Sequence, residues 1–437
     1  MSESFSSNYS DNGLTPKLHK KPNPLEAFFR NLFISFLLFQ IYRTNFLSLL
    51  KLLQILGLTP FMFIARKINK LLWRKQVPPS YKIKDKIEST TTQIYFSRSK
   101  LTGIDLCMKL WPKRQVGDSS QEDPRDQLKN LLEGLSFNRH FAPGIYLGIA
   151  PVDAGENAEK ILRGDLIINP NLKNLKPGKY VIVMRNIRKE WKLDYKLRME
   201  RSDLRTIEGM EFLARQIADM HAELEPSPEE KNCPDIIASK LAYNIKRLKD
   251  AISMAGNASM LEEYDYICRV MNDANYNFSS YFEQRRRNGH IKRCHGDLKT
   301  SNLWVSPRQL LPRKLFAFDC IDFKFDFCHI DTLSDIAMLA VDIQQVLSGS
   351  GMNDKEVGEL RTHFLDSYLK KMQEEDNYAK PLLEYYMTEK AMVCSYVSFL
   401  LDDAPDLGKI YFSIAYQLAQ DLEKSLVPTN PYELIQF

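Results

Sequence analysis

The stretch CHGDLKTSNLWV, Cys294–Val305, places a histidine, an aspartate, a lysine and an asparagine directly before an apolar run typical of a buried strand. A surface loop has no need of such a strand, and a core strand does not tolerate unpaired charges. Charged side chains held at the edge of a core usually mark a functional site. The stretch therefore predicts a site of chemistry at the margin of a hydrophobic core.

The polar residues of this stretch follow the spacing His295-x-Asp297-x-x-x-x-Asn302, and Asp319 ends a further apolar strand 17 residues later. One carboxylate can accept the proton of a substrate hydroxyl, while an amide oxygen and a second carboxylate can hold Mg²⁺ on phosphates. The pattern therefore predicts phosphoryl transfer. Asp297 is the expected base, Lys299 reaches the transferred phosphoryl group, and Asn302 and Asp319 are the expected metal ligands.

A lysine and a glutamate earlier in the chain complete the predicted nucleotide site. Lys109 lies at the end of the apolar strand in IDLCMKLW, and a lysine in that place needs an anionic partner. Glu133, on a helix expected at 127–141, is the natural partner, and the pair would seat the α- and β-phosphates of ATP. The alternative is a solvent-facing role for each. The hydroxyl-rich loop ESTTT, 88–92, can contact phosphate or simply cap a turn.

The order of elements predicts two lobes. Three strand-like segments precede the helix at 127–141 and two follow it, at 81–87, 92–97, 104–111, 144–152 and 180–186. Helical spacing then dominates, with helices at 202–224, where Ser202 is the expected cap and Ile207 faces inward, and at 236–255, 261–283 and 384–403. We predict a sheet-rich nucleotide-binding lobe at 78–188 and a helical catalytic and acceptor-binding lobe at 189–437.

Four segments resemble the aminoglycoside phosphotransferase family of kinase-like enzymes, in an uncharacterised bacterial branch with a CHGDLH…N…FDCIEF pattern. They are LEGLSFNRHFAPGIYLGIAPV, CHGDLKTSN, FDCIDF and HIDTLSDIA, and the resemblance covers about residues 80–400. It implies an α+β, two-lobed, protein-kinase-like fold that binds ATP and Mg²⁺ between the lobes. It also implies that His295 and Asp335 brace the catalytic loop, and it assigns Lys109 and Glu133 to the nucleotide.

The sequence departs from that branch in three ways. Lys299 stands where the branch usually has histidine, the nucleotide loop has no glycine, and a fused P-loop ATPase domain found in some members is absent. The substrate of a relative is therefore not carried over.

Three functions fit this pattern. The first is an ATP- and Mg²⁺-dependent phosphotransferase acting on a hydroxyl of a small molecule. The second is a catalytically silent nucleotide-binding module that scaffolds or signals at a membrane. The third is a protein kinase, which Lys299 favours but the short segment after Asp319 does not. Asp322 is either a second metal ligand or a loop residue, and Asp402, Asp403 and Asp406 could add charge toward an amine acceptor.

The N-terminus predicts a tail and a membrane-surface segment. Residues 1–24 have the composition of a disordered tail. Residues 25–77 contain two charge-free apolar runs, 31–42 and 52–65, both shorter than a spanning helix needs. Between Lys17 and Lys75 there are eleven basic residues and one acidic residue, which suits helices lying on an anionic membrane face. The alternatives are a helical pair packed on the protein or a basic nucleic-acid arm.

The bulk composition is that of a folded chain in a reducing compartment. The 437 residues are 44% hydrophobic and 26% charged, with a net charge of +5 that does not by itself indicate nucleic-acid binding. Seven cysteines, an odd count without a Cys-x-x-Cys motif, argue against a disulfide framework and favour the cytoplasm. Together with the N-terminal segment, this predicts a cytoplasmic protein at the inner face of the membrane. The spacing of Cys294, Cys320 and Cys328 matches no common zinc site.

Overall fold

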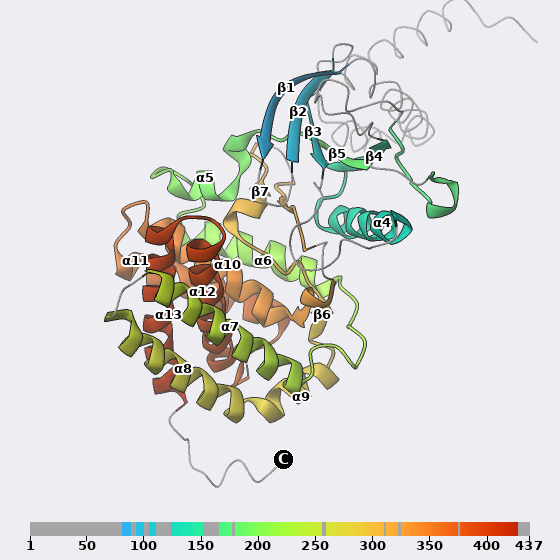
Figure 1. Cartoon of the computed structure of the whole chain (residues 1–437). Coiled ribbons are helices and arrows are strands. Elements are labelled where there is room, and N and C mark those ends of the chain that lie inside the picture. Colours follow the sequence, from blue (N-terminus) through green and yellow to red (C-terminus); the bar gives the residue numbers. More distant parts are fainter. Residues whose placement is uncertain are drawn as a thin grey trace, which may run out of the picture.

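A small sheet lies against a larger helical body in the computed structural model (Figure 1). The structure describes residues 81–88, 93–99, 105–110, 124–151, 166–176, 180–255, 259–309, 312–321, 325–374 and 376–426. The predicted two-lobed α+β arrangement is confirmed. The N-terminal segments 1–24 and 25–77, Asp322 and most of the 88–92 loop lie outside these ranges. No helix within them is long and apolar enough to cross a bilayer.

The sheet has five strands in the order β1-β2-β3-β5-β4, and each neighbouring pair is antiparallel. Val181 and Val183 of β5 pack in one apolar cluster, while Ile182 and Met184 pack in another that includes residues of α4. Because both faces are covered, β5 is a continuous apolar run rather than an alternating one. The elements are β1 Tyr81–Glu88, β2 Gln93–Ser99, β3 Asp105–Leu110, α4 Pro124–Phe141, β4 Tyr146–Pro151 and β5 Tyr180–Arg185.

The helical body holds the largest hydrophobic cluster of the described residues. Its helices are α5 Leu193–Arg198, α6 Ile207–Ala222, α7 Pro234–Ala255, α8 Ser259–Asn277, α9 Ser279–Arg287, α10 Thr332–Ser348, α11 Asp354–Met372, α12 Ala379–Leu400 and α13 Pro405–Ser425. The segment expected as one helix at 261–283 is therefore divided between α8 and α9.

The expected cap of α6 is wrong. The Thr206 side chain accepts a hydrogen bond from the Gly209 N–H, so the helix begins at Ile207. Ser202 instead accepts from the Leu204 N–H at 3.3 Å, within the preceding turn. Because the helix begins later than predicted, Ile207 lies in its exposed first turn rather than in the core.

Short strands at the junction carry the predicted site. β6 Ile291–Arg293 pairs with β9 His329–Asp331, and β7 Leu303–Val305 pairs with β8 Leu315–Ala317. The spacing read from the sequence thus falls on the loop from β6 to β7 and on the residues after β8. In Figure 1, β7 lies between the sheet and the helical body. The loop is therefore positioned between the sheet lobe and the helices.

Candidate functional site

The loop between β6 and β7 brings three of the predicted site residues together. The Lys299 Nζ lies 3.1 Å from the Asp297 Oδ1. The Asn302 Nδ2 donates to the Asp297 Oδ2 at 3.0 Å and to the Asp297 carbonyl oxygen at 2.9 Å. A single 3₁₀ turn, Thr300–Asn302, returns the chain so that these side chains meet. The loop therefore offers a carboxylate that is held from two sides.

The charge state of Asp297 is set by these neighbours. Burial by itself raises the pKa of Asp297, but the Lys299 ammonium and the Asn302 amide outweigh it, and the net pKa is lowered. The Asp297 carboxylate in turn raises the pKa of Lys299, against the opposing effect of burial. The two groups are therefore an ion pair at neutral pH, with the carboxylate able to accept a proton.

Asp319 lies in a turn with left-handed backbone geometry. Its φ of 60° is uncommon for a residue other than glycine. The turn is held by the Asp319 N–H, which donates to the Tyr146 hydroxyl at 3.0 Å, and by the Cys320 N–H, which donates to the Asn138 Oδ1 at 3.2 Å. The Asp319 side chain is 52% exposed. Strained backbone conformations of this kind cluster at functional sites.

The expected ion pair between Lys109 and Glu133 is replaced by two other pairs in the structure. Lys109, at the end of β3, forms an ion pair with Asp319. Glu133, on α4, accepts from the Arg293 guanidinium at 2.8 Å. The same guanidinium lies 4.2 Å from the centre of the Phe137 ring, so it is held by stacking as well as by charge. This stacked arginine offers Glu133 a nearer partner than Lys109 does.

His295 and Asp335 make the contacts that a brace of the loop requires. The buried His295 ring donates from Nε2 to the Phe318 carbonyl oxygen at 2.8 Å and accepts at Nδ1 from the Asp297 N–H at 3.4 Å. Asp335, on α10, accepts from the His295 and Gly296 N–H groups at 3.1 and 2.9 Å. The histidine ring thus joins the Asp297 loop to the residue before Asp319.

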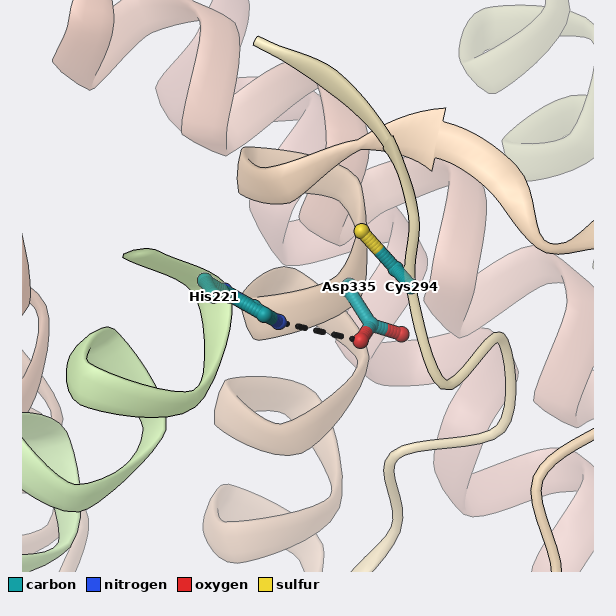
Figure 2. A group of neighbouring side chains, drawn as sticks. All are labelled: His221, Cys294 and Asp335. Atoms are coloured by element: carbon teal, nitrogen blue, oxygen red, sulfur yellow. Dashed lines mark hydrogen bonds and ion pairs between the residues drawn. The ribbon is translucent and has the colours of Figure 1, made fainter. Parts of the chain in front are cut away.

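Figure 2 shows the surroundings of Asp335, where His221, Cys294 and Asp335 meet. Their possible metal-ligand atoms lie within 4.8 Å of one another. The His221 Nε2 lies 3.1 Å from the Asp335 Oδ2, however, and its Nδ1 lies 2.6 Å from the Tyr368 hydroxyl. Burial raises the pKa of Asp335, but hydrogen bonds from His221 and Gly296 lower it overall. These hydrogen bonds already use both ring nitrogens of His221 and both carboxylate oxygens of Asp335. The cluster therefore supports the loop rather than binding a metal ion.

A second acid on α10 holds the other half of the loop, and the sequence reasoning missed it. The Asp342 Oδ2 accepts from both the N–H and the hydroxyl of Thr300, each at 2.6 Å. Its Oδ1 accepts from the Tyr411 hydroxyl at 2.6 Å. Asp335 and Asp342 are seven residues apart, so they share one face of the helix. The sequence signal that could have revealed Asp342 was the presence of two acids, seven residues apart, in an otherwise apolar helix.

A pocket of about 230 Å³ opens beside Lys299. It lies between α5, the loop, α10, and the adjoining ends of α12 and α13. Most of α12 is core, as predicted, but one face of it lines this pocket. Of the three acids considered for an amine acceptor, Asp402 is in the lining. The lining includes Arg198, Lys299, Gln345, Cys394, Asp402 and Tyr411.

Comparison with known proteins finds similar solved structures. No family model and no curated protein matches the sequence. The chain is similar to a choline kinase from Cryptosporidium parvum Iowa II, with 15% identity over 84% of this chain and 99% of that chain and a TM-score of 0.49. An ethanolamine kinase from Plasmodium vivax has 13% identity over 77% and 81% of the two chains, with a TM-score of 0.41. For an aminoglycoside phosphotransferase-like protein from Ralstonia eutropha JMP134 the identity is 11% over 82% and 98%, with a TM-score of 0.40.

Proposed function

We propose that the chain is an ATP- and Mg²⁺-dependent phosphotransferase that acts on a hydroxyl group of a small molecule. One observation carries the proposal. The Asp297 carboxylate is ionised and paired with Lys299 on a braced loop, and Asp319 follows in a strained turn beside it. Lys109 reaches the same Asp319 from the sheet. This set supplies a base, two lysines and oxygen ligands at one junction.

The residues present fit a divalent cation. Asp319 is half exposed, and both hydrogen bonds that Asn302 makes through its side chain use Nδ2, which leaves its Oδ1 without a donor among the described residues. The Phe318 N–H donates to the Asn302 carbonyl oxygen at 2.8 Å and so keeps the two segments adjacent. Carboxylate and amide oxygens are ligands that Mg²⁺ accepts. A bound cation would neutralise phosphate charge there.

The protein groups have separate tasks in this proposal. Asp297 orients the acceptor hydroxyl and takes its proton, while Lys299 keeps that carboxylate ionised and faces the transferred phosphoryl group. Lys109 leaves Asp319 for the phosphates when nucleotide enters. Glu133 then has two possible cationic partners, Arg293 and Lys109. Positioning and charge neutralisation are sufficient for this reaction, because phosphoryl transfer asks for little covalent chemistry from the protein.

The experiment is a calorimetric titration of the full chain with ATP, with and without Mg²⁺. We expect Mg²⁺-dependent binding that Asp319→Ala abolishes. Asp326→Ala is the matched control, because Asp326 is an exposed acid nearby that pairs with Lys231. Asp297→Asn should lose transfer by a factor of at least about 100 while keeping ATP affinity, because the residue acts on the acceptor. Absence of Mg²⁺-ATP binding to folded wild type would contradict the proposal, and binding without transfer to any acceptor would favour the silent module.

We also propose that residues 25–77 hold the protein at the anionic inner face of a membrane, from the cytoplasm. The support is the sequence alone, namely two apolar runs flanked by basic residues. A membrane-linked or envelope-linked acceptor would then be within reach of the site.

A further inference from the structure

Three cationic side chains converge on one carboxylate where the connection from α5 to α6 meets the hairpin of β7 and β8. The Arg313 Nη1 lies 2.8 Å from the Asp203 Oδ2, and the Arg308 Nε lies 3.7 Å from the same oxygen. Lys196, on α5, is close enough for the charges of Arg313 and Asp203 to act on its pKa. Both arginines belong to the hairpin, whereas Asp203 lies between the two helices. The fold thus brings these charges together from segments that are far apart in the sequence.

The single carboxylate does not satisfy the three cations. The Asp203 Oδ2 accepts no hydrogen bond in spite of its ion pairs, and the Nε and Nη2 of Arg313 are buried without an acceptor. Lys196 has no carboxylate within ion-pair distance among the residues that the structure describes, and its pKa is lowered by burial and by the Arg313 charge. Buried donors without acceptors are costly, above all on charged groups. The cluster therefore holds more positive charge and more donors than Asp203 can use.

The remaining neighbours keep the cluster positive and open to solvent. Glu208, an exposed residue in the first turn of α6, is a second acid within electrostatic range of Arg308. With Glu208 counted, three cations still face two acids. The Arg313 Cζ lies 4.7 Å from the centre of the Phe212 ring, so stacking fixes the orientation of this guanidinium. The side chains of Arg308 and Asp203 are 73% and 34% exposed, which leaves an approach from water.

The cluster is separate from the pocket described above. Asp194 and Arg198 are four residues apart on α5, so they share one face of that helix, and both line the pocket. Lys196 lies two residues from each of them and therefore points to the other side of the helix. The electrostatic effect of Arg313 and Asp203 on Lys196 agrees with this direction. A ligand of the cluster would thus lie across α5 from the pocket.

We propose that the cluster is a binding site for a phosphate group, held by Arg308, Lys196 and Arg313. A phosphomonoester offers three oxygens and close to two negative charges, whereas a carboxylate offers two oxygens and one charge. Guanidinium groups match the oxygens of phosphate in bidentate pairs. The phosphate meets Arg308 and Lys196 from the solvent side, while the more buried Arg313 adds its charge. The site does not depend on the proposed phosphotransferase function.

The test titrates the full chain with inorganic phosphate and with glycerol 3-phosphate at low ionic strength, and calorimetry follows the binding. We expect Arg308→Ala to raise Kd about tenfold, because it removes a charge-assisted contact. Arg287→Ala is the matched control, since the Arg287 side chain is also 73% exposed and also pairs with an acid. Phosphate bound at the proposed nucleotide site would respond equally to the two substitutions.

A second variant predicts a change in the opposite direction. Asp203→Asn removes the anion with which a phosphate competes, so we expect Kd to fall severalfold. A role of Asp203 and Arg308 that is limited to holding the hairpin predicts no gain in affinity. Thermal unfolding shows whether each variant is folded, and phosphate should raise the midpoint of Asp203→Asn more than that of wild type. If Asp203→Asn does not fold, the comparison of Arg308→Ala with Arg287→Ala decides alone.

Sedimentation with vesicles distinguishes the two sources of such a group. Vesicles of phosphatidylcholine with phosphatidic acid present a phosphomonoester on a lipid. A loss of sedimentation in Arg308→Ala beyond that in Arg287→Ala assigns the site to a lipid headgroup. Equal sedimentation, together with a tenfold effect on glycerol 3-phosphate, assigns it to a dissolved phosphomonoester. The proposal is overturned if Arg308→Ala and Arg287→Ala behave alike in both assays, or if a folded Asp203→Asn binds phosphate more weakly than wild type.

Discussion

At the residue scale, Lys299 sets the range of pH in which Asp297 can act. Because the Lys299 ammonium lowers the pKa of a carboxyl group that burial would raise, replacing the lysine should raise that pKa. We predict that Lys299→Met moves the acidic limb of the kcat/KM profile to higher pH and lowers its plateau at least about tenfold. Lys299→Arg keeps the charge and should restore the position of the limb. An acidic limb that does not move in the methionine variant would contradict this role.

Asp335 should control the acid stability of the fold. Its pKa is lowered in the folded state, so its contribution is present above the unfolded value of about 3.9 and is lost as pH falls through the folded value. Asp335→Asn leaves the buried N–H donors with a poorer acceptor. We therefore expect the free energy of unfolding at pH 7 to fall by about 3 kcal/mol. The variant should also lose less stability than wild type between pH 5 and 3. Urea unfolding across this range measures both effects, and parallel pH curves for the two proteins would rule out the assignment.

The predicted site residues that the structure brings together are those that lie close in the chain. Asp297, Lys299 and Asn302 lie within six residues, and their spacing alone indicated that they meet. The partner that Glu133 has in this structure, Arg293, was not predicted, because it is 160 residues away and nothing local to either residue marks the contact. Side-chain partners over such distances follow from packing, which a single sequence does not contain.

At the scale of elements, α6 contains a glycine that the fold requires for close approach. An added Cβ at Gly209 would lie 2.4 Å from the Asp203 carbonyl oxygen, which is backbone and cannot easily move. We predict that Gly209→Ala destabilises the protein by about 2 kcal/mol, although alanine favours helix. Gly358→Ala, on α11, meets nothing within 4 Å and should stabilise by about 1 kcal/mol. Urea midpoints that shift in the same direction for both variants would show that helix propensity decides instead.

The helix α10 acts as the scaffold of the loop. Its cap, Asp331, accepts from the Leu333 N–H and pairs with Arg285. Asp335 holds the start of the loop, and Asp342 holds Thr300. The bracing role of Asp335 was implied by the family resemblance. The role of Asp342 was not, because its meaning depends on Tyr411 and Thr300, which lie on other elements.

At the scale of the whole molecule, one short segment receives several of the contacts between the two lobes. Lys109 of β3 and Tyr146 of β4 reach Asp319, while Asn138 of α4 holds the next residue. The same segment receives the His295 ring through Phe318. A change in the position of the sheet therefore acts directly on the expected metal ligand. Cooperative closure of the lobes on a nucleotide would use this connection.

Removal of residues 1–77 separates the membrane proposal from the packed-pair alternative. The sheet and the helical body each have a hydrophobic cluster among the described residues. We therefore expect the remaining chain to keep its free energy of unfolding within about 1 kcal/mol, since the described residues of these clusters all remain. Basic residues near a membrane contribute about 1 kcal/mol each on anionic lipid. Loss of the segment should thus abolish sedimentation with phosphatidylserine vesicles.

The outcome of this deletion decides what the apolar runs do. A truncated chain that stays folded and no longer sediments supports attachment to the membrane surface, and raising salt should release the full chain because its basic residues are then screened. Vesicles of neutral lipid are the control, and they should bind the full chain more weakly. A truncated chain that aggregates or melts early means that the runs cover apolar surface of the protein itself. In that case the membrane proposal fails, because the apolar runs would then not be available to a lipid surface.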